Sequence, residues 1–101
     1  MPEFSTPFSG MNAERKLTKG ELIRLIRFNI AAEYEAIQLY MQAHDSIDDE
    51  ISKKVLLDIA NEEKEHVGEF MRLLKHLAPD EEGFYKEGEA EVEEMMKKIG
   101  K

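Results

Sequence analysis

Apolar residues recur every three or four positions along two long stretches of the chain, and this spacing predicts two amphipathic helices. The first helix is expected from near Thr18, where Thr-Lys-Gly-Glu fits a capping box, to about Asp45. The second is expected from about Asp49 to Leu77, where a proline follows closely. Turn-forming residues join the two stretches, so we predict an antiparallel helical hairpin over residues 17–79.

The regions on either side of the hairpin have weaker patterns. Residues 1–16 contain two of the three prolines and no apolar period, which predicts a mobile tail. In residues 80–101, four apolar side chains fall at i, i+3, i+4 and i+7 and predict a short C-terminal helix. These four residues are Val92, Met95, Met96 and Ile99. The pattern does not indicate where that helix would dock.

The apolar seam of each long helix is interrupted in its middle by polar residues, Glu33 on the first helix and Glu63 with His66 on the second. The full seams are Ile23, Ile26, Ile30, Glu33, Ile37, Tyr40 and His44, and Ser52, Leu56, Ile59, Glu63, His66, Phe70, Leu73 and Leu77. A buried carboxylate without a partner is costly, and no Lys or Arg occupies either seam. A divalent or trivalent cation is therefore the simplest compensation.

The three polar seam residues lie at matching distances from the predicted turn. Glu33 precedes it by about 15 residues, and Glu63 and His66 follow it by about 15 to 18, so an antiparallel hairpin brings them to one level. A Glu from one helix and Glu-x-x-His from the next form half of the dinuclear carboxylate site of ferritin-like bundles. Because the chain carries one copy of each, we expect a homodimer in which two hairpins complete a four-helix bundle and its site.

Each candidate ligand could also have a role that involves no metal. If the helix phase is different, Glu33 faces solvent, and Glu63 and His66 belong to a solvated charged run. Glu62 is an alternative to Glu63, because residues 62 and 66 also lie one turn apart, although the seam register favours Glu63. Glu35 fits a solvent-facing or interface position as well as a weaker metal role, and Tyr40 fits plain core packing.

The amino-acid composition excludes several kinds of partner and of metal site. The chain of 101 residues has 22 Asp and Glu, 14 Lys and Arg, a net charge of −8 and no Cys. The acidic surplus argues against nucleic acid and membrane surfaces as partners, and no signal peptide or bilayer-spanning stretch is evident, so we expect a cytoplasmic protein. The lack of Cys excludes disulfides, thiolate zinc and iron–sulfur sites, and carboxylates with one imidazole per ion suit iron or manganese.

Two segments of the chain, AAEYEAIQLY at 31–40 and NEEKEH at 61–66, resemble the encapsulated ferritins, short members of the ferritin/rubrerythrin superfamily. The resemblance covers roughly residues 18–77. It implies a two-helix protomer, a di-iron ferroxidase centre at a dimer interface and ring-like decamers. It also implies storage of oxidised iron inside the shell of an encapsulin nanocompartment.

By matching position, the resemblance implies that Glu33, Glu63 and His66 are the iron ligands and that Tyr40 lies just outside them. Glu35 would belong to a peripheral metal site whose usual second carboxylate is replaced by Ala32. Without Cys the chain also lacks the rubredoxin unit of rubrerythrins, which favours a ferroxidase. The alternatives are a di-iron or di-manganese protein that scavenges peroxide and a metal-free helical interaction module.

Overall fold

The computed structural model describes residues 12–101. Three helices make up this part of the chain, α1 (Lys19–Asp45), α2 (Glu50–Leu77) and α3 (Glu81–Lys98). The all-α prediction is confirmed, and the two long helices begin and end within about one residue of their expected bounds. Residues 1–11 of the predicted tail lie outside the described residues, and residues 12–18 are not helical.

A complete capping box begins α1. The amide of Glu21 donates to Thr18 Oγ1 at 3.2 Å, and the amide of Thr18 donates to Glu21 Oε1 at 2.8 Å. The Arg15 guanidinium adds two hydrogen bonds of 2.7 Å to the same carboxylate. The hydrogen bonds from Arg15 and, to a lesser extent, the one from the Thr18 amide lower the pKa of Glu21 to about 2. The helix start is therefore specified by local sequence alone.

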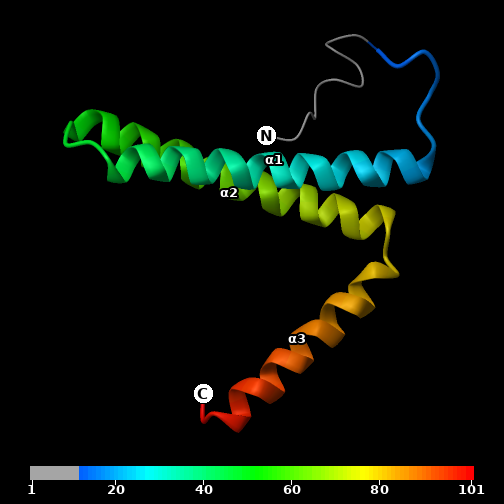
Figure 1. Cartoon of the computed structure of the whole chain (residues 1–101). Coiled ribbons are helices and arrows are strands. Elements are labelled where there is room, and N and C mark those ends of the chain that lie inside the picture. The colour runs from blue at the N-terminus through cyan, green and yellow to red at the C-terminus, as the bar shows by residue number, and fades with distance from the viewer. Residues whose placement is uncertain (1–11) are drawn as a thin grey trace.

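The turn between α1 and α2 is held by side chains as well as by its backbone. Asp49 accepts a hydrogen bond from the amide of Ser52 at 3.0 Å and so caps α2. Lys53 Nζ donates to the carbonyl of His44 at 2.8 Å and to that of Ile47 at 3.3 Å. These contacts tie the last turn of α1 to the first turn of α2 and favour the antiparallel hairpin of Figure 1.

The hairpin packs along its length, and its largest apolar cluster lies at the open end. Ile26, Leu74 and Ala78 are buried there against five half-buried apolar neighbours. Those neighbours are Leu22, Ile23, Ile30, Phe70 and Leu77. Two further buried positions, Ile37 and Ala60, extend the packing beyond the cluster. None of the seam residues predicted for α1 is exposed, so its predicted phase is correct.

One of the two rows of residues predicted to form the α2 seam is wrong, because the packed row lies one residue further along the helix. The residues of α2 that pack most deeply are Ala60, Val67 and Leu74, each one position after a predicted seam residue. His66 and Leu73 instead lie exposed at the edge of the contact. The apolar arc of α2 is wide enough to contain both heptad rows, and the small side chain of the fully buried Ala60 lets α2 lie close to α1 at that point.

The C-terminal helix is longer than expected and diverges from the hairpin. α3 has 18 residues, none of them buried, and its N-cap residue Asp80 makes no side-chain capping bond. Arg27 pairs with Glu81, and Lys75 pairs with Glu82 at 3.1 Å, so its first turn is attached to the open end of the hairpin. Beyond that turn the helix points away, as Figure 1 shows. In residues 12–101, no helix combines the length and apolar character that crossing a bilayer requires.

Candidate metal centre

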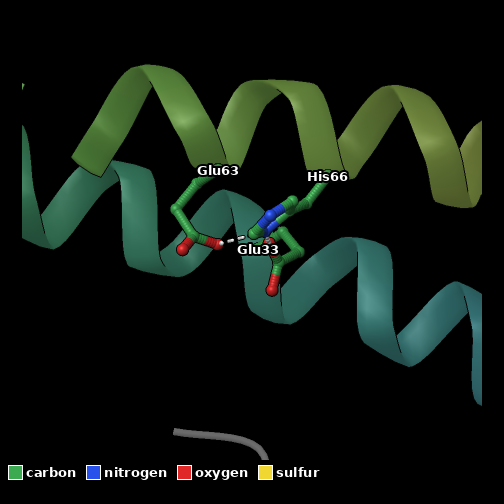
Figure 2. A group of neighbouring side chains, drawn as sticks. All are labelled: Glu33, Glu63 and His66. Carbon is green, nitrogen blue, oxygen red and sulfur yellow. Dashed lines mark hydrogen bonds and ion pairs between the residues drawn. The ribbon is translucent and has the colours of Figure 1, made fainter. Parts of the chain in front are cut away.

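Glu33 of α1 and the pair Glu63 and His66 of α2 point toward one another across the hairpin (Figure 2). Each side chain offers one ligand atom, and the three atoms lie within 4.8 Å of one another. His66 Nδ1 is 3.1 Å from Glu33 Oε2 and 3.5 Å from Glu63 Oε2. Within residues 12–101 this is the one such group of three metal-ligating side chains.

The helices bring these residues together in the way that their spacing indicates. Glu63 and His66 lie one turn apart on α2 and project toward the same part of α1. Glu33 lies between the packed residues Ile30 and Ile37 of the α1 seam, so its carboxylate enters the contact between the helices. The predicted level of all three residues along the hairpin agrees with their positions, because both helices run without interruption from the turn.

The site is partly shielded from solvent and open on one side. The side chains of Glu33 and Glu63 are 22% and 17% exposed, whereas that of His66 is 49% exposed. The carboxylates therefore lie inside the hairpin contact, and the imidazole lies at its edge. Glu33, Glu63 and His66 would hold an ion with fewer donors than a usual metal shell, so further ligands would have to complete that shell.

The electrostatics are those of two carboxylates close together with a base beside them. A hydrogen bond with the Glu63 carboxyl, which requires a proton, raises the pKa of Glu33, and partial burial raises it further, while His66 opposes both. The hydrogen bond to Glu33 raises the pKa of His66, and the charge of Glu63 adds to this. Folding thus favours the protonated forms of Glu33 and His66, and a bound cation would compete with those protons.

The donor set suits a metal ion of intermediate hardness. Carboxylate oxygens and one imidazole nitrogen are ligands that iron and manganese accept, and the site has no thiolate to favour softer ions. A cation would offset the close contact with Glu63 and the partial burial, which together raise the pKa of Glu33, and it would compete with protons for the same oxygen atoms. The residues present therefore fit a metal of this kind.

The remaining candidates lie outside this group. Glu62 is exposed, and the close set contains Glu63 instead. Glu35 is half-buried, but it lies two residues from Glu33 and so projects from a different side of α1. Tyr40 is half-buried two turns after Glu33 on the same side of the helix, which suits a neighbouring position. All three residues of the group were already candidates from the sequence.

A helical hairpin that carries Glu on one helix and Glu-x-x-His on the next belongs to the ferritin-like class of helical proteins. The rubrerythrin family model matches residues 25–101, and the chain belongs to this family. The crystal structure of the encapsulated ferritin domain from Pyrococcus furiosus is similar, with a TM-score of 0.80 and 45% identity over 85% of this chain and 88% of that one. The predicted resemblance to encapsulated ferritins is confirmed.

Two curated proteins are also similar in sequence. A ferritin-like-encapsulin shell fusion protein of Pyrococcus furiosus is 46% identical over 85 residues, which are 84% of this chain and 25% of the relative. The encapsulin nanocompartment cargo protein EncC of Myxococcus xanthus is 40% identical over 87 residues, which are 86% of this chain and 65% of the relative. The chain therefore spans about a quarter of one relative and less than two thirds of the other.

Proposed function

We propose that this chain is a ferroxidase, which oxidises ferrous iron to ferric iron at a dinuclear site shared by two copies. The observation that carries the proposal is the convergence of Glu33, Glu63 and His66, with ligand atoms within 4.8 Å of one another. One Glu and one Glu-x-x-His motif are half of the ligand set of a di-iron carboxylate centre. A two-fold homodimer supplies the other half with no further residue type.

The side of α2 that bears His66 supports such a dimer. Ile59, His66 and Leu73 repeat every seven residues and therefore share one face, which Val55 extends toward the turn. Val55 and Leu73 are large apolar residues that remain exposed in the single chain. An apolar strip with a half-exposed ligand in its middle suits burial against a second hairpin, which would also exclude water from the metals.

The proposed roles follow from the chemistry of each group. Glu33 and Glu63 bind or bridge the ferrous ions and compensate their charge, and His66 contributes a neutral imidazole to the same ion. The ligands must be deprotonated to bind, so low pH should oppose binding. Each ferrous ion then loses one electron, dioxygen or peroxide takes up the electrons together with protons from solvent, and ferric iron is released.

Iron as both substrate and electron source fits a chain without Cys, which has no rubredoxin-type thiolates to receive electrons from elsewhere. The match to the rubrerythrin family supports a second candidate, a di-iron or di-manganese protein that scavenges peroxide. The ratio of the oxidation rates with peroxide and with dioxygen separates the two. A faster reaction with peroxide favours the second candidate.

The names of the relatives support a setting for this activity. One similar protein is a fusion to an encapsulin shell, and another is an encapsulin cargo protein. We propose that the chain acts as cargo inside a cytoplasmic encapsulin nanocompartment, where ferric iron is stored and detoxified. A ring-like decamer built from the homodimers is part of this proposal.

Anaerobic titration with ferrous iron, followed by exposure to air, tests the function. The parent chain is expected to bind iron and to develop the optical absorption of ferric iron on exposure. Glu63→Ala and the double variant Glu33→Ala with His66→Ala should lower the initial oxidation rate at least about 100-fold, since even supporting residues of metal sites contribute about 10–100-fold.

Glu62→Ala is the matched control, because it removes the neighbouring carboxylate outside the group and should leave the rate within about twofold. Equal losses in Glu62→Ala and Glu63→Ala would contradict the assignment of Glu63. A parent chain that forms dimers but binds no iron would support a metal-free interaction module in place of the ferroxidase.

A further inference from the structure

Ala60 is the most deeply buried residue within 12–101, with 0% of its surface exposed. It lies on α2 one turn before Glu63, on the side of the helix that packs against α1. Its side chain is a single methyl group, which cannot bind a metal. Val67 follows Glu63 by four residues and is also buried, so the ligand stands between two packed positions of α2. Ala60 is therefore part of both the helix contact and the surroundings of the ligands.

A large residue of α1 lies at the same level as this small residue of α2. Ile37 follows Glu33 by four residues and is buried. Because both helices run toward the same turn, Ile37 and Ala60 each lie about one helical turn, or about 4.5–6 Å, from the ligand of their own helix on the turn side. The helices are thus packed through a large and a small side chain directly beside the ligands.

The separation of two packed helices depends on the side chains at which they meet. Interaxial distances range over about 8–10 Å, and small residues at the contact allow the shorter values. Protein interiors are close-packed, so a larger side chain at Ala60 would have to displace one of the helices or its neighbouring side chains. The methyl group of Ala60 therefore permits a close approach of α1 and α2 where the ligands meet.

The ligand group tolerates little extra separation of the helices. Two donors bound to one divalent ion at about 2.0–2.2 Å are at most about 4.4 Å apart. The three ligand atoms already span distances up to 4.8 Å. Glu33 is the only one of the three on α1, so any widening acts on its distances to the other two, as Figure 2 shows. An increase of about 1–2 Å, the range open to packed helices, would take Glu33 away from a shared ion.

We propose that Ala60 is a positioning residue for the metal site, and that its small side chain sets the helix separation at which Glu33 reaches an ion bound to the two ligands of α2. The inference rests on the proposed function, because it concerns the same site, and it adds a residue that touches no metal. Ala60 is buried inside the hairpin, whereas His66 lies at its exposed edge. Its effect therefore arises within each copy and not through the contact between two copies.

Enlargement of the side chain at Ala60 tests the proposal. Ala60→Leu adds three carbon atoms and keeps a strong helix former at this position. Anaerobic titration calorimetry with ferrous iron measures the affinity, and the absorption spectrum of bound cobalt(II) reports the arrangement of the ligands. Ala60→Leu is expected to weaken iron binding at least about 10-fold and to change the cobalt spectrum, since residues around metal ligands contribute about 10–100-fold. Ala60→Val overpacks less and should show a smaller loss.

Ala78→Leu is the matched control for the loss of stability that overpacking causes. Ala78 is also buried, belongs to the apolar cluster at the open end, and lies about 27 Å from Ala60 along the helix direction. The same addition there should lower the melting temperature to a similar extent but leave the iron affinity within about twofold. Equal losses of affinity in Ala60→Leu and Ala78→Leu would overturn the proposal, because they would show that the overall stability of the hairpin limits binding.

A compensating substitution tests whether helix separation is the cause. Ile37→Ala removes three carbon atoms from the opposite helix, so the double variant Ala60→Leu with Ile37→Ala conserves the side-chain volume at this level. It should regain iron affinity to within about threefold of the parent, together with the parental cobalt spectrum. A folded double variant that binds iron no better than Ala60→Leu would overturn the proposal.

The conservative variant Ala60→Gly separates positioning from stability. Glycine keeps this position small but weakens the helix, so the melting temperature should fall while the iron affinity stays close to that of the parent. If Ala60 contributes only to stability, the affinity of Ala60→Gly falls together with the melting temperature. That result would contradict the positioning role. Sedimentation velocity and circular dichroism on each sample verify that the variants keep the oligomeric state and helical content of the parent.

The same measurements distinguish this inference from the proposed function. A parent that binds iron but does not oxidise it contradicts the ferroxidase alone, and the affinities of the variants still test Ala60. Parental affinity in a folded Ala60→Leu, with an unchanged cobalt spectrum, contradicts the positioning role alone. A parent that binds neither iron nor cobalt contradicts the metal site on which both proposals depend.

Discussion

α2 and α3 are both amphipathic helices, yet within residues 12–101 only α2 packs along another helix. α2 buries Ala60, Val67 and Leu74 against α1, whereas α3 buries no residue. The difference lies in the connections. The α1–α2 turn is capped and tied by side chains, and it returns α2 along α1 over its whole length. The α2–α3 connection at Pro79 sends α3 away from the hairpin after one turn of contact. An amphipathic pattern thus predicts that a partner exists, but not where it lies.

The middle of the hairpin is an exception within the well-packed region. At the open end the helices meet through Ile26 and Leu74, while at the centre they meet through carboxylates and an imidazole. The open end stabilises the hairpin, whereas the polar groups at the centre replace apolar packing and so lower its stability. The following predictions test this contrast between packed and unpacked parts.

The largest effect on stability is expected from Leu74→Ala. Truncation of a buried leucine typically costs about 2–5 kcal/mol, and Leu74 belongs to the main apolar cluster. Val92→Ala on α3 should change the free energy of unfolding by less than about 0.5 kcal/mol in dilute protein, because Val92 is exposed. Urea denaturation followed by circular dichroism measures both. Equal costs would show that α3 is packed within the single chain.

Glu33→Leu is expected to stabilise the metal-free chain by about 1–2 kcal/mol while it removes iron binding, because it replaces a half-buried charge with an apolar side chain between Ile30 and Ile37. The gain should depend on pH. The pKa of Glu33 is raised above its ordinary value of 4.5, so the ionised form destabilises the fold as the pH rises through that raised pKa. Thermal denaturation at pH 4 and pH 8 should show the larger gain at pH 8. A loss of stability at both values would contradict this account of the site.

Substitutions at the N-termini of α1 and α3 should have smaller effects on stability. Thr18→Ala removes a complete capping box and should cost about 1 kcal/mol. Asp80→Ala at the start of α3 should have a smaller effect, because Asp80 makes no capping hydrogen bond. The shift in melting temperature measures both. A larger shift for Asp80→Ala would indicate that the start of α3 is held more tightly than its contacts suggest.

The smallest effect is expected from the ion pair of Glu21. The folded chain lowers its pKa from 4.5 to about 2, so its contribution to stability is present above pH 4.5 and is lost as the pH falls toward 2. Glu21→Gln can still cap the helix but loses the charge interaction with Arg15. The parent should therefore melt slightly above the variant at pH 7, and the two should converge near pH 2. A constant difference across this range would exclude the carboxylate charge as its cause.

Local sequence was sufficient for much of the hairpin. The capping residues Thr18 and Asp49 locate the starts of α1 and α2, and the proline after Ala78 locates the end of α2. The group of Glu33, Glu63 and His66 could also be predicted, because equal distances from one turn bring residues of antiparallel helices to the same level. These features depend on hydrogen bonds and on helical rise, which act over a few residues or follow from simple counting.

Rotation of a helix about its axis and the direction of a chain after a bend depend on contacts between distant residues. Both rows of α2, one with Ile59 and His66 and the other with Ala60 and Val67, fit an apolar pattern, and only packing against α1 selected the second row. The sequence alone determined which helices form and that Glu33, Glu63 and His66 lie close together. The tertiary structure decided that His66 lies at an open edge and that α3 points away from its own hairpin, because these outcomes are set by long-range packing and by the ion pairs at the base of α3.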